Sequence, residues 1–286
     1  MPNILITGSN GQLGSEIRSL ESTYNQYNFF FTDIQELDIT NKESIQLYVT
    51  SNNIKIIINC AAYTAVDKAE NELELANKIN NRAVEYLAKV AKINHCKFIH
   101  ISTDYVFDGC NYKPYTETDL PNPQSVYGKT KLEGELVLQK INPLNSIIIR
   151  TSWVYSKFGN NFVKTMQKLS EERDTLNIID DQIGTPTNAG DLAKTILEIL
   201  PKINNKNKVE IFHFSNEGVC SWFDFAKAIL EHKNVKCKVN PISSDQYPTI
   251  AKRPHYSLLN KAKIKEVYKI KIDYWKDSLN FFLMNL

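Results

Sequence analysis

With 286 residues and a mass of 32.8 kDa, the chain is long enough to bury a full hydrophobic core in one large or two modest domains. Hydrophobic residues make up 42% and charged residues 23%, and the net charge of +2 gives no reason to expect nucleic acid or an anionic membrane as the main partner. The apolar runs, such as "KIIIN", are too short to span a bilayer, and "MPNILITGSNG" does not resemble a signal peptide.

The spacing of cysteines and histidines bears on the cellular compartment of the protein and on whether it binds a metal. The five cysteines are odd in number and form no C-x-x-C pair, which favours free thiols in a reducing compartment. The five histidines show no metal-ligand spacing, so no metal site is predicted. We expect a cytoplasmic protein.

The first half of the chain alternates short apolar runs with helical patterns. We expect strands at residues 3–7, 27–33, 54–61, 97–103 and 145–152, and helices at 11–22, 41–51, 67–94 and 126–141. The strands are apolar on both faces, which predicts a parallel sheet covered by helices on both sides. This is an α/β doubly wound, Rossmann-like fold.

After about residue 152 the alternation loosens. We expect helices at 160–172, 190–200 and 221–232, terminal helices ending in 273–286, a strand at 208–215 and a turn-rich loop at 180–192. The sequence therefore predicts a dinucleotide-binding domain over residues 1–152 and a smaller, mainly substrate-binding α/β part over 153–286. Some segments of the second part should return to the first.

A glycine-rich turn, "TGSNGQLGS", stands between the first strand and the first helix. Gly8, Gly11 and Gly14 follow a G-x-x-G-x-x-G spacing that would let the backbone approach a phosphate at the helix N-terminus, although such turns also serve plain strand–helix packing. Asp33 ends the second strand, where a carboxylate can accept both hydroxyls of an adenosine ribose. Together they predict dinucleotide binding. Ile34 and Gln35 supply no arginine for a 2′-phosphate, so we expect NADH to be used at least as well as NADPH.

The ends of the third and fourth predicted strands, and the helix predicted at 126–141, carry the next candidate site residues. Ala61 and Ala62 end the third strand, where small residues suit either a passing cofactor or tight packing. The fourth strand ends in "STDYVFDG", which packing alone does not require, and Thr103 precedes Tyr127 by 24 residues. Tyr127 and Lys131 are four apart on one helix face, either as a lysine stem lying over a ring or as a phenol whose pKa the ammonium lowers. With the strand end nearby, we predict a proton-transfer site.

The ordered motifs "GSNGQLG", "STDYVFDG", "YGKTK" and "RTSWVY" resemble the extended short-chain dehydrogenase/reductase superfamily. With "NCAAYTAVDKAE", "GNNFVKTM", "DDQIGTPT" and "AKRPHYSLLN", the chain resembles the dTDP-4-dehydrorhamnose reductase family over nearly its full length. The resemblance implies reduction of the 4-keto group of dTDP-4-dehydro-L-rhamnose to dTDP-L-rhamnose by NADH or NADPH, in deoxysugar-nucleotide biosynthesis.

The resemblance also implies roles for individual residues. Tyr127 would be the proton donor, with Lys131 as its partner and a ligand of the nicotinamide ribose. Thr103 would be catalytic and, with Asp104 and Trp153, would bind the substrate. Cofactor contacts would come from Gly11, Gln12, Leu13, Asp33, Asp38, Ile39, Ala61, Ala62, Thr64, Tyr127 and Lys131.

Two further side chains could have either a functional role or an ordinary structural one. Trp153 offers a flat apolar surface to a deoxysugar methyl group, or is an ordinary core tryptophan. Arg253, beside Lys252, could hold the substrate pyrophosphate, or the two could be an ordinary surface pair.

One motif departs from the family pattern. Some members form a dimer around a magnesium ion held by glutamates, of which Glu16 matches the first, but Gly190 stands where the second is expected. With a carboxylate missing, the sequence argues against that Mg²⁺ site and favours a monomer or a weak homodimer.

Other functions remain as alternatives. A sugar-nucleotide 4,6-dehydratase would need an acid after Thr103–Asp104, where this chain has Tyr105, and a 4-epimerase is the related rival. A non-catalytic nucleotide-binding regulatory subunit would not need the Tyr127–Lys131 pair. A related nucleotide-linked 4-keto-sugar could also be the substrate.

Overall fold

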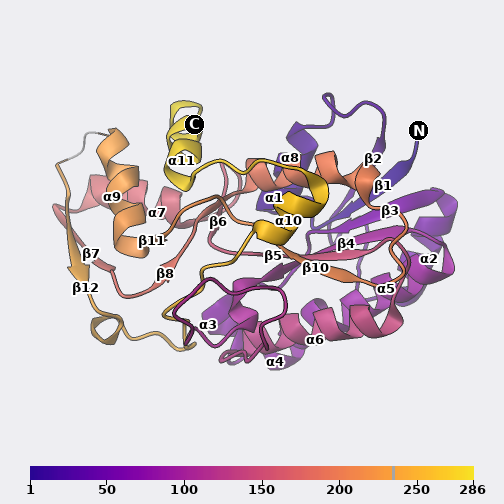
Figure 1. The fold of residues 1–286 in the computed structure, drawn as a ribbon, viewed down its shortest axis with the longest axis horizontal. Coiled ribbons are helices and arrows are strands. Elements are labelled where there is room, and N and C mark those ends of the chain that lie inside the picture. The colour runs from indigo at the N-terminus through magenta and orange to yellow at the C-terminus, as the bar shows by residue number, and fades with distance from the viewer. Residues whose placement is uncertain (234–235) are drawn as a thin grey trace.

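The computed structural model describes residues 1–233 and 236–286, and a six-stranded parallel sheet forms its centre. The strands are β1 (Asn3–Thr7), β2 (Asn28–Thr32), β3 (Ile54–Asn59), β4 (Lys97–Thr103), β5 (Ile147–Thr151) and β10 (Glu210–His213). They lie in the order β10-β5-β4-β3-β1-β2 (Figure 1). The predicted doubly wound fold is confirmed, and the chain reverses its direction of travel across the sheet between β1 and β3.

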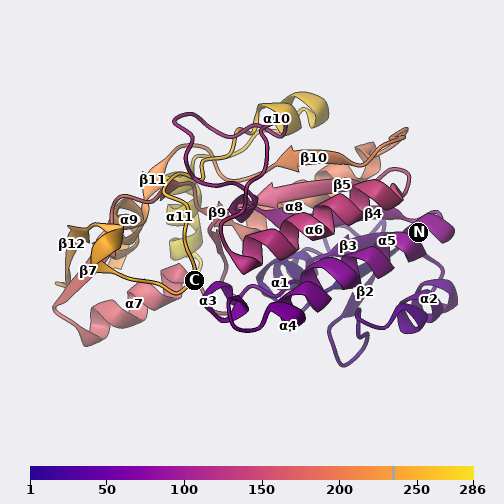
Figure 2. The ribbon, with the colours of Figure 1, turned by 90° about the horizontal axis from the view of Figure 1, so that it is seen from below.

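Helices cover both faces of this sheet (Figures 1 and 2). One face carries α1 (Gln12–Ser19), α8 (Ala189–Ile199) and α10 (Ala262–Tyr268), and the other carries α2 (Lys42–Ser51), α5 (Ala83–Ile93) and α6 (Val126–Ile141). Each face buries its own apolar cluster because the strands are hydrophobic on both sides, as the sequence predicted.

The long helix predicted over 67–94 is wrong in its continuity. The segment forms α3 (Val66–Ala69), α4 (Leu73–Asn77), a π-helical turn (Lys78–Arg82) and α5. Asn80, which is buried in the π-helical turn, exchanges hydrogen bonds with the backbone of Tyr63 over 2.8 and 3.1 Å and donates to the Thr130 hydroxyl over 3.2 Å. Hydrogen bonds from Asn80 to residues 17 and 50 positions away in the sequence hold the turn. Helical periodicity in the sequence cannot predict such bonds.

A second, smaller lobe lies beyond the carboxyl ends of the strands, at the left of Figure 1. Its helices are α7 (Phe162–Glu172), α9 (Trp222–Lys233) and α11 (Trp275–Met284), and its strands are β6 (Val154–Tyr155), β7 (Thr175–Ile179), β8 (Ile183–Gly184), β9 (Thr187–Asn188), β11 (Cys220–Ser221) and β12 (Lys238–Ile242). The loop predicted at 180–192 therefore contains β8 and β9, which pair with β11 and β6, and the first residues of α8. Such two-residue strands are too short to show a period-2 pattern.

Segments from the second half return to the large sheet. Strand β10 pairs with β5, while α8 and α10 contribute to the core on one sheet face. The predicted division at residue 152 stays a prediction. No helix in the described ranges is long and apolar enough to cross a membrane.

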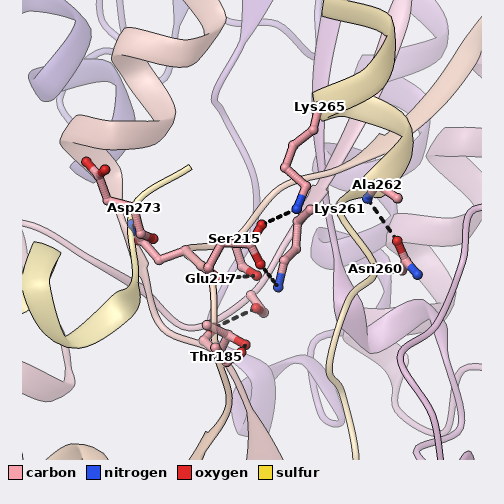
Figure 3. Close-up of polar contacts among 11 residues, drawn as sticks. Thr185, Ser215, Glu217, Asn260, Lys261, Ala262, Lys265 and Asp273 are labelled. Atoms are coloured by element: carbon pink, nitrogen blue, oxygen red, sulfur yellow. Dashed lines mark hydrogen bonds and ion pairs between the residues drawn. The ribbon is translucent and has the colours of Figure 1, made fainter. Parts of the chain in front are cut away.

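An ion-pair cluster lies where the chain leaves β10 for the smaller lobe (Figure 3). The Glu217 carboxylate lies 3.6 Å from the Lys261 ammonium and 2.5 Å from that of Lys265, and its amide donates to the Asp273 carbonyl. Burial lowers the pKa of Lys261. Because one carboxylate contacts both lysines, we interpret the cluster as a structural connection between α10 and the chain leaving β10.

Candidate active site

The main cavity, of about 580 Å³, opens where β1, β3, β4 and β5 end. This is where ligands bind to open α/β sheets. Ten of its lining residues were predicted site residues: Gly11, Gln12, Leu13, Ala62, Thr64, Thr103, Asp104, Tyr127, Lys131 and Trp153.

A second cavity of about 380 Å³ adjoins the first and shares Gly11, Cys60 and Ala62 with it. It brings together five further predicted residues: Gly8, Asp33, Asp38, Ile39 and Ala61. Leu37, Leu75 and Ile79 give it an apolar wall, which suits a flat base such as adenine. Of the predicted residues, Gly14 and Arg253 line neither cavity.

The glycine-rich turn connects the two cavities. Gly8 has a φ of +64°, and a Cβ there would lie 2.6 Å from the Ala61 backbone, so this position requires glycine. Gly14 lies inside α1, where a Cβ would lie 2.5 Å from Ser9 Cα. Gly14 therefore lets the helix pack closely on the turn.

Two carboxylates lie near the proposed ribose and base positions. The Asn10 amide donates to Asp33 Oδ2 over 3.1 Å, which holds Asp33 against the turn. Asp38 accepts hydrogen bonds from the hydroxyl and amide of Thr40, and these, led by the hydroxyl, hold its pKa below the ordinary value. Both side chains face the second cavity as acceptors.

Tyr127 lies in the first turn of α6, whose start is fixed by Ser125. The Ser125 hydroxyl accepts a hydrogen bond from the Gly128 amide over 3.1 Å, as an N-cap does. The Tyr127 ring makes an edge-to-face contact with Tyr105, with ring centres 5.5 Å apart. Burial raises the pKa of Tyr127 to about 12, and a hydrogen bond with Thr103 opposes that rise.

The pKa of Tyr127 is thus raised in this structure and not lowered as expected from Lys131, because burial, aided by the Asp104 charge, outweighs the Thr103 hydrogen bond. Lys131 is itself 1% exposed, and its Nζ donates to the Ile101 carbonyl over 2.6 Å. Burial lowers the pKa of Lys131 to about 8, while Glu135 and Cys60 oppose the change. The ammonium lines the same cavity as Tyr127 but is held by the end of β4.

Thr103 and Asp104 are at the end of β4 and are both buried. The Thr103 hydroxyl donates to Asp104 Oδ1 over 3.0 Å and accepts from the Tyr105 amide. Burial raises the pKa of Asp104 to about 6, against hydrogen bonds from Ser257 and Thr103 that lower it. A hydroxyl, a phenol and a carboxyl group thus share one wall of the cavity.

A buried ion pair that was not predicted from the sequence supports this wall. Glu135, one turn after Lys131 on α6, accepts two hydrogen bonds from Arg150 Nε and one from Nη2, the shortest 2.6 Å long, and another from the Ser102 hydroxyl. Glu135 and Arg150 are each about 1% exposed. An arginine inside the apolar run "SIIIRTS" was the available indication, because a buried charge requires a partner.

Trp153 lines the cavity together with Trp222, which was not predicted as a site residue. Their rings stack with centres 3.7 Å apart and planes inclined by 14°. Trp153 has a φ of +48°, which is unusual for a bulky residue and is a strained conformation typical of functional sites. The two indoles form one apolar wall of the cavity.

Arg253 bridges the lobes by pairing with Asp67. Its Nη1 and Nη2 donate to the two carboxylate oxygens over 3.1 and 2.7 Å, and the Ala251 amide adds a bond of 3.0 Å. The pair holds the loop 247–254 against α3. Lys252 is exposed and lines neither cavity.

The predicted departure at the magnesium position can be described in the structure. Glu16 accepts a hydrogen bond from the Ser156 hydroxyl over 2.6 Å, and a Cβ built on Gly190 would lie 3.7 Å from Glu16 Oε2. The two aligned positions are therefore neighbours, with one carboxylate between them. In the described ranges no three His, Cys, Asp or Glu side chains gather as a metal site would require.

Known proteins resemble this chain over its whole length. The family described as "RmlD substrate binding domain" matches residues 2–286. A dTDP-4-dehydrorhamnose reductase of Aggregatibacter actinomycetemcomitans is 44% identical over 98% of this chain and 97% of its own. Crystal structures of such reductases from Clostridium acetobutylicum (42% identity, 99% and 100% of the two chains) and from Bacillus anthracis in complex with NADP (38% identity, 100% of each chain) both superpose with a TM-score of 0.94.

Proposed function

The chain belongs to the dTDP-4-dehydrorhamnose reductase family, and from this premise we propose how its residues reduce the 4-keto group of dTDP-4-dehydro-L-rhamnose to dTDP-L-rhamnose. The protein is an NAD(P)H-dependent oxidoreductase of deoxysugar-nucleotide biosynthesis. The observation that carries the assignment of roles is that Tyr127, Thr103 and Lys131 line one cavity with the glycine-rich turn.

Tyr127 is the proton donor in this proposal. A bound nicotinamide supplies the hydride to C4 of the sugar, and negative charge then builds on O4. A phenol with a pKa of about 12 is protonated at neutral pH and can give its proton to that oxygen. The Thr103 hydroxyl can hydrogen-bond the same oxygen as charge develops.

Lys131 and the cavity walls orient the reactants. The Lys131 ammonium keeps donors free beyond its bond to Ile101, and these can reach the nicotinamide ribose. The stacked indoles of Trp153 and Trp222 suit the methyl-bearing face of a 6-deoxysugar, and Asp104 can accept a sugar hydroxyl. The apolar wall and carboxylates of the second cavity suit the adenosine part.

Arg253 is proposed to hold the substrate pyrophosphate. The guanidinium lies near Tyr105, which lines the cavity, and raises the positive potential on that side. Its bidentate pair with Asp67 means that it would share or exchange this partner when a diphosphate binds.

The partner of this protein is a small nucleotide-sugar. Within the same proposal the chain is a monomer or a weak homodimer, since one carboxylate of the inter-subunit magnesium set is replaced by Gly190. We propose the cytoplasm as its compartment on the cysteine pattern, and no nucleic acid or membrane as a partner on the charge balance.

The function is tested by NADH and NADPH oxidation with dTDP-4-dehydro-L-rhamnose, in wild type and in Tyr127→Phe. The variant loses only the hydroxyl, so folding and cofactor affinity should stay nearly unchanged while turnover falls at least about 100-fold. A kcat within about threefold of wild type would remove Tyr127 from the proton-donor role. If NADH and NADPH were not oxidised with this sugar but were oxidised with another nucleotide-linked 4-keto-sugar, that other sugar would be the substrate. Nucleotide binding without any turnover would favour a regulatory subunit.

A further inference from the structure

The end of β2 and the glycine-rich turn meet at a tightly bonded corner. The Ser9 amide donates to the Thr32 carbonyl over 3.0 Å, and the Asn10 amide donates to Asp33 Oδ2 over 3.1 Å. A carboxylate at this point of a Rossmann sheet receives the hydroxyls of the adenosine ribose. The 2′-position of a bound dinucleotide therefore belongs at this corner.

Arg18 reaches the same corner from α1. Its Nη2 donates to the Ser9 hydroxyl over 3.0 Å, and its guanidinium lies 4.3 Å from the centre of the Phe31 ring. Phe31 lies in β2, and Asp33 directly follows the last residue of that strand, Thr32. Because Ser9 and Asn10 are consecutive, Arg18 and Asp33 contact neighbouring residues of the glycine-rich turn, and Arg18 does so from outside the two cavities.

The Arg18 guanidinium has capacity for an anionic ligand. In residues 1–232 and 236–286, no carboxylate lies within ion-pair distance of Arg18. The group has five N–H donors, of which the bond to Ser9 uses one, and its planar fork matches phosphate oxygens. The Phe31 face supports the plane and leaves its edge free.

Lys78, another cation near this corner, is already close to a carboxylate. Lys78 lines the second cavity with Asp33, but its charge contributes to lowering the pKa of Asp38. Arg18 is therefore the better candidate for a negative group at the ribose 2′-position.

We propose that Arg18 receives the 2′-phosphate of NADPH and is the residue that allows this protein to use NADPH despite Asp33. Asp33 repels a 2′-phosphate, and the Arg18 guanidinium, bonded to Ser9 of the adjoining turn, offsets that repulsion with charge-assisted hydrogen bonds. The expected use of both NADH and NADPH then results from the opposite charges of Asp33 and Arg18 near the ribose 2′-position. The inference rests on the proposed function only in taking a nicotinamide dinucleotide as the ligand.

The test is calorimetric binding of NADPH, NADH, 2′,5′-ADP and 5′-AMP to wild type and to Arg18→Leu, without any sugar. Arg18→Leu should weaken NADPH and 2′,5′-ADP about tenfold or more, as expected for a lost charge-assisted contact. NADH and 5′-AMP should change by less than about twofold, because they lack the phosphate. Arg18→Lys, which keeps the charge without the fork, should lie between the two.

A matched control removes an equal charge elsewhere. Arg173→Leu, at an exposed position after α7, should leave all four affinities unchanged. Equal weakening of phosphorylated and unphosphorylated ligands by Arg18→Leu would overturn the proposal, as would no weakening at all. A selective loss of NADPH in Lys78→Leu, with none in Arg18→Leu, would transfer the role to Lys78. Because no sugar is present, these results stand whether or not the reductase assay succeeds.

Discussion

At the scale of single residues, burial affects the pKa of each proposed proton-transfer group, Tyr127 and Lys131, more than neighbouring charges do. Burial raises the pKa of Tyr127 and lowers that of Lys131, so both groups are held closer to their neutral forms. The Tyr127 phenol is therefore protonated at neutral pH in this structure. A neutral phenol beside a cavity is instead suited to giving away its proton.

Lys131→Met should impair both cofactor affinity and turnover. The substitution removes the donors proposed for the nicotinamide ribose and a charge beside the cavity, while the aliphatic stem is kept. We expect NADH affinity to fall about tenfold or more, as for a lost hydrogen bond to a charged group, and kcat to fall further. Fluorescence titration of NADH and single-turnover rates measure the two effects separately.

Lys129→Met is the matched control, because Lys129 lies in the same helix and is exposed. It should leave affinity and rate unchanged. If Lys131→Met altered only the pH optimum and left NADH affinity intact, the role at the ribose would be refuted.

The predicted site residues and those that were not predicted differ in how far apart their contact partners are in the sequence. Tyr127 and Lys131 are one helical turn apart, so spacing alone predicts that they share a face. Arg18 and Trp222 were missed because their contacts join separate elements, α1 to β2 and α9 to the chain after β5. The pair of Glu135 with Arg150 likewise joins α6 to β5. Periodicity within one helix or strand cannot predict contacts between separate elements.

At the scale of elements, β8 fixes one wall of the cavity. Gly184 in β8 lies against Trp153, and a Cβ there would lie 2.9 Å from two ring atoms of the indole. The indole is held from the other side by Trp222. A short strand in a segment predicted to be a loop therefore sets the position of a predicted substrate contact.

Gly184→Ala should displace the Trp153 ring and weaken substrate binding. We expect KM for the nucleotide-sugar to rise about tenfold, corresponding to roughly 1.4 kcal/mol of lost binding, with NADH affinity unchanged. The exciton signal of the stacked indoles in circular dichroism should decrease in parallel. Val219→Ala, at an exposed position just before β11, serves as the control. Unchanged KM together with an unchanged exciton signal would show that β8 does not position the tryptophan.

At the scale of the whole molecule, the sheet predicted from the first half is complete only with β10 from the second half. The alternation of strands and helices gave the fold class, because apolar runs on both faces are a local property. The return of β10, α8 and α10 to the large sheet depends on packing between distant segments, which sequence patterns alone do not locate. The same return places His213 inside the protein.

Acid should destabilise the protein through His213. The imidazole is fully buried in β10 with Nδ1 3.1 Å from the Tyr115 carbonyl, and burial, aided by the nearby Arg150 charge, lowers its pKa from 6.5 to about 3. Above about pH 7 His213 is neutral in both the folded and unfolded states, so its contribution to stability is fully present. Between pH 6.5 and about 3 the unfolded chain binds a proton that the folded protein refuses, so the free energy of unfolding falls as the pH falls.

Urea unfolding at a series of pH values tests this in wild type and in His213→Gln, which keeps a donor but cannot titrate in this range. The wild-type free energy of unfolding should fall more steeply below pH 6.5 than that of the variant, by at most about 1.4 kcal/mol per pH unit for one proton. The variant should be less stable near neutral pH, because an amide fills the buried ring site poorly. His232→Gln, at an exposed position, should follow the wild-type pH dependence closely. Parallel curves for wild type and His213→Gln would show that other groups, such as the buried His100 whose pKa burial also lowers, determine the acid sensitivity.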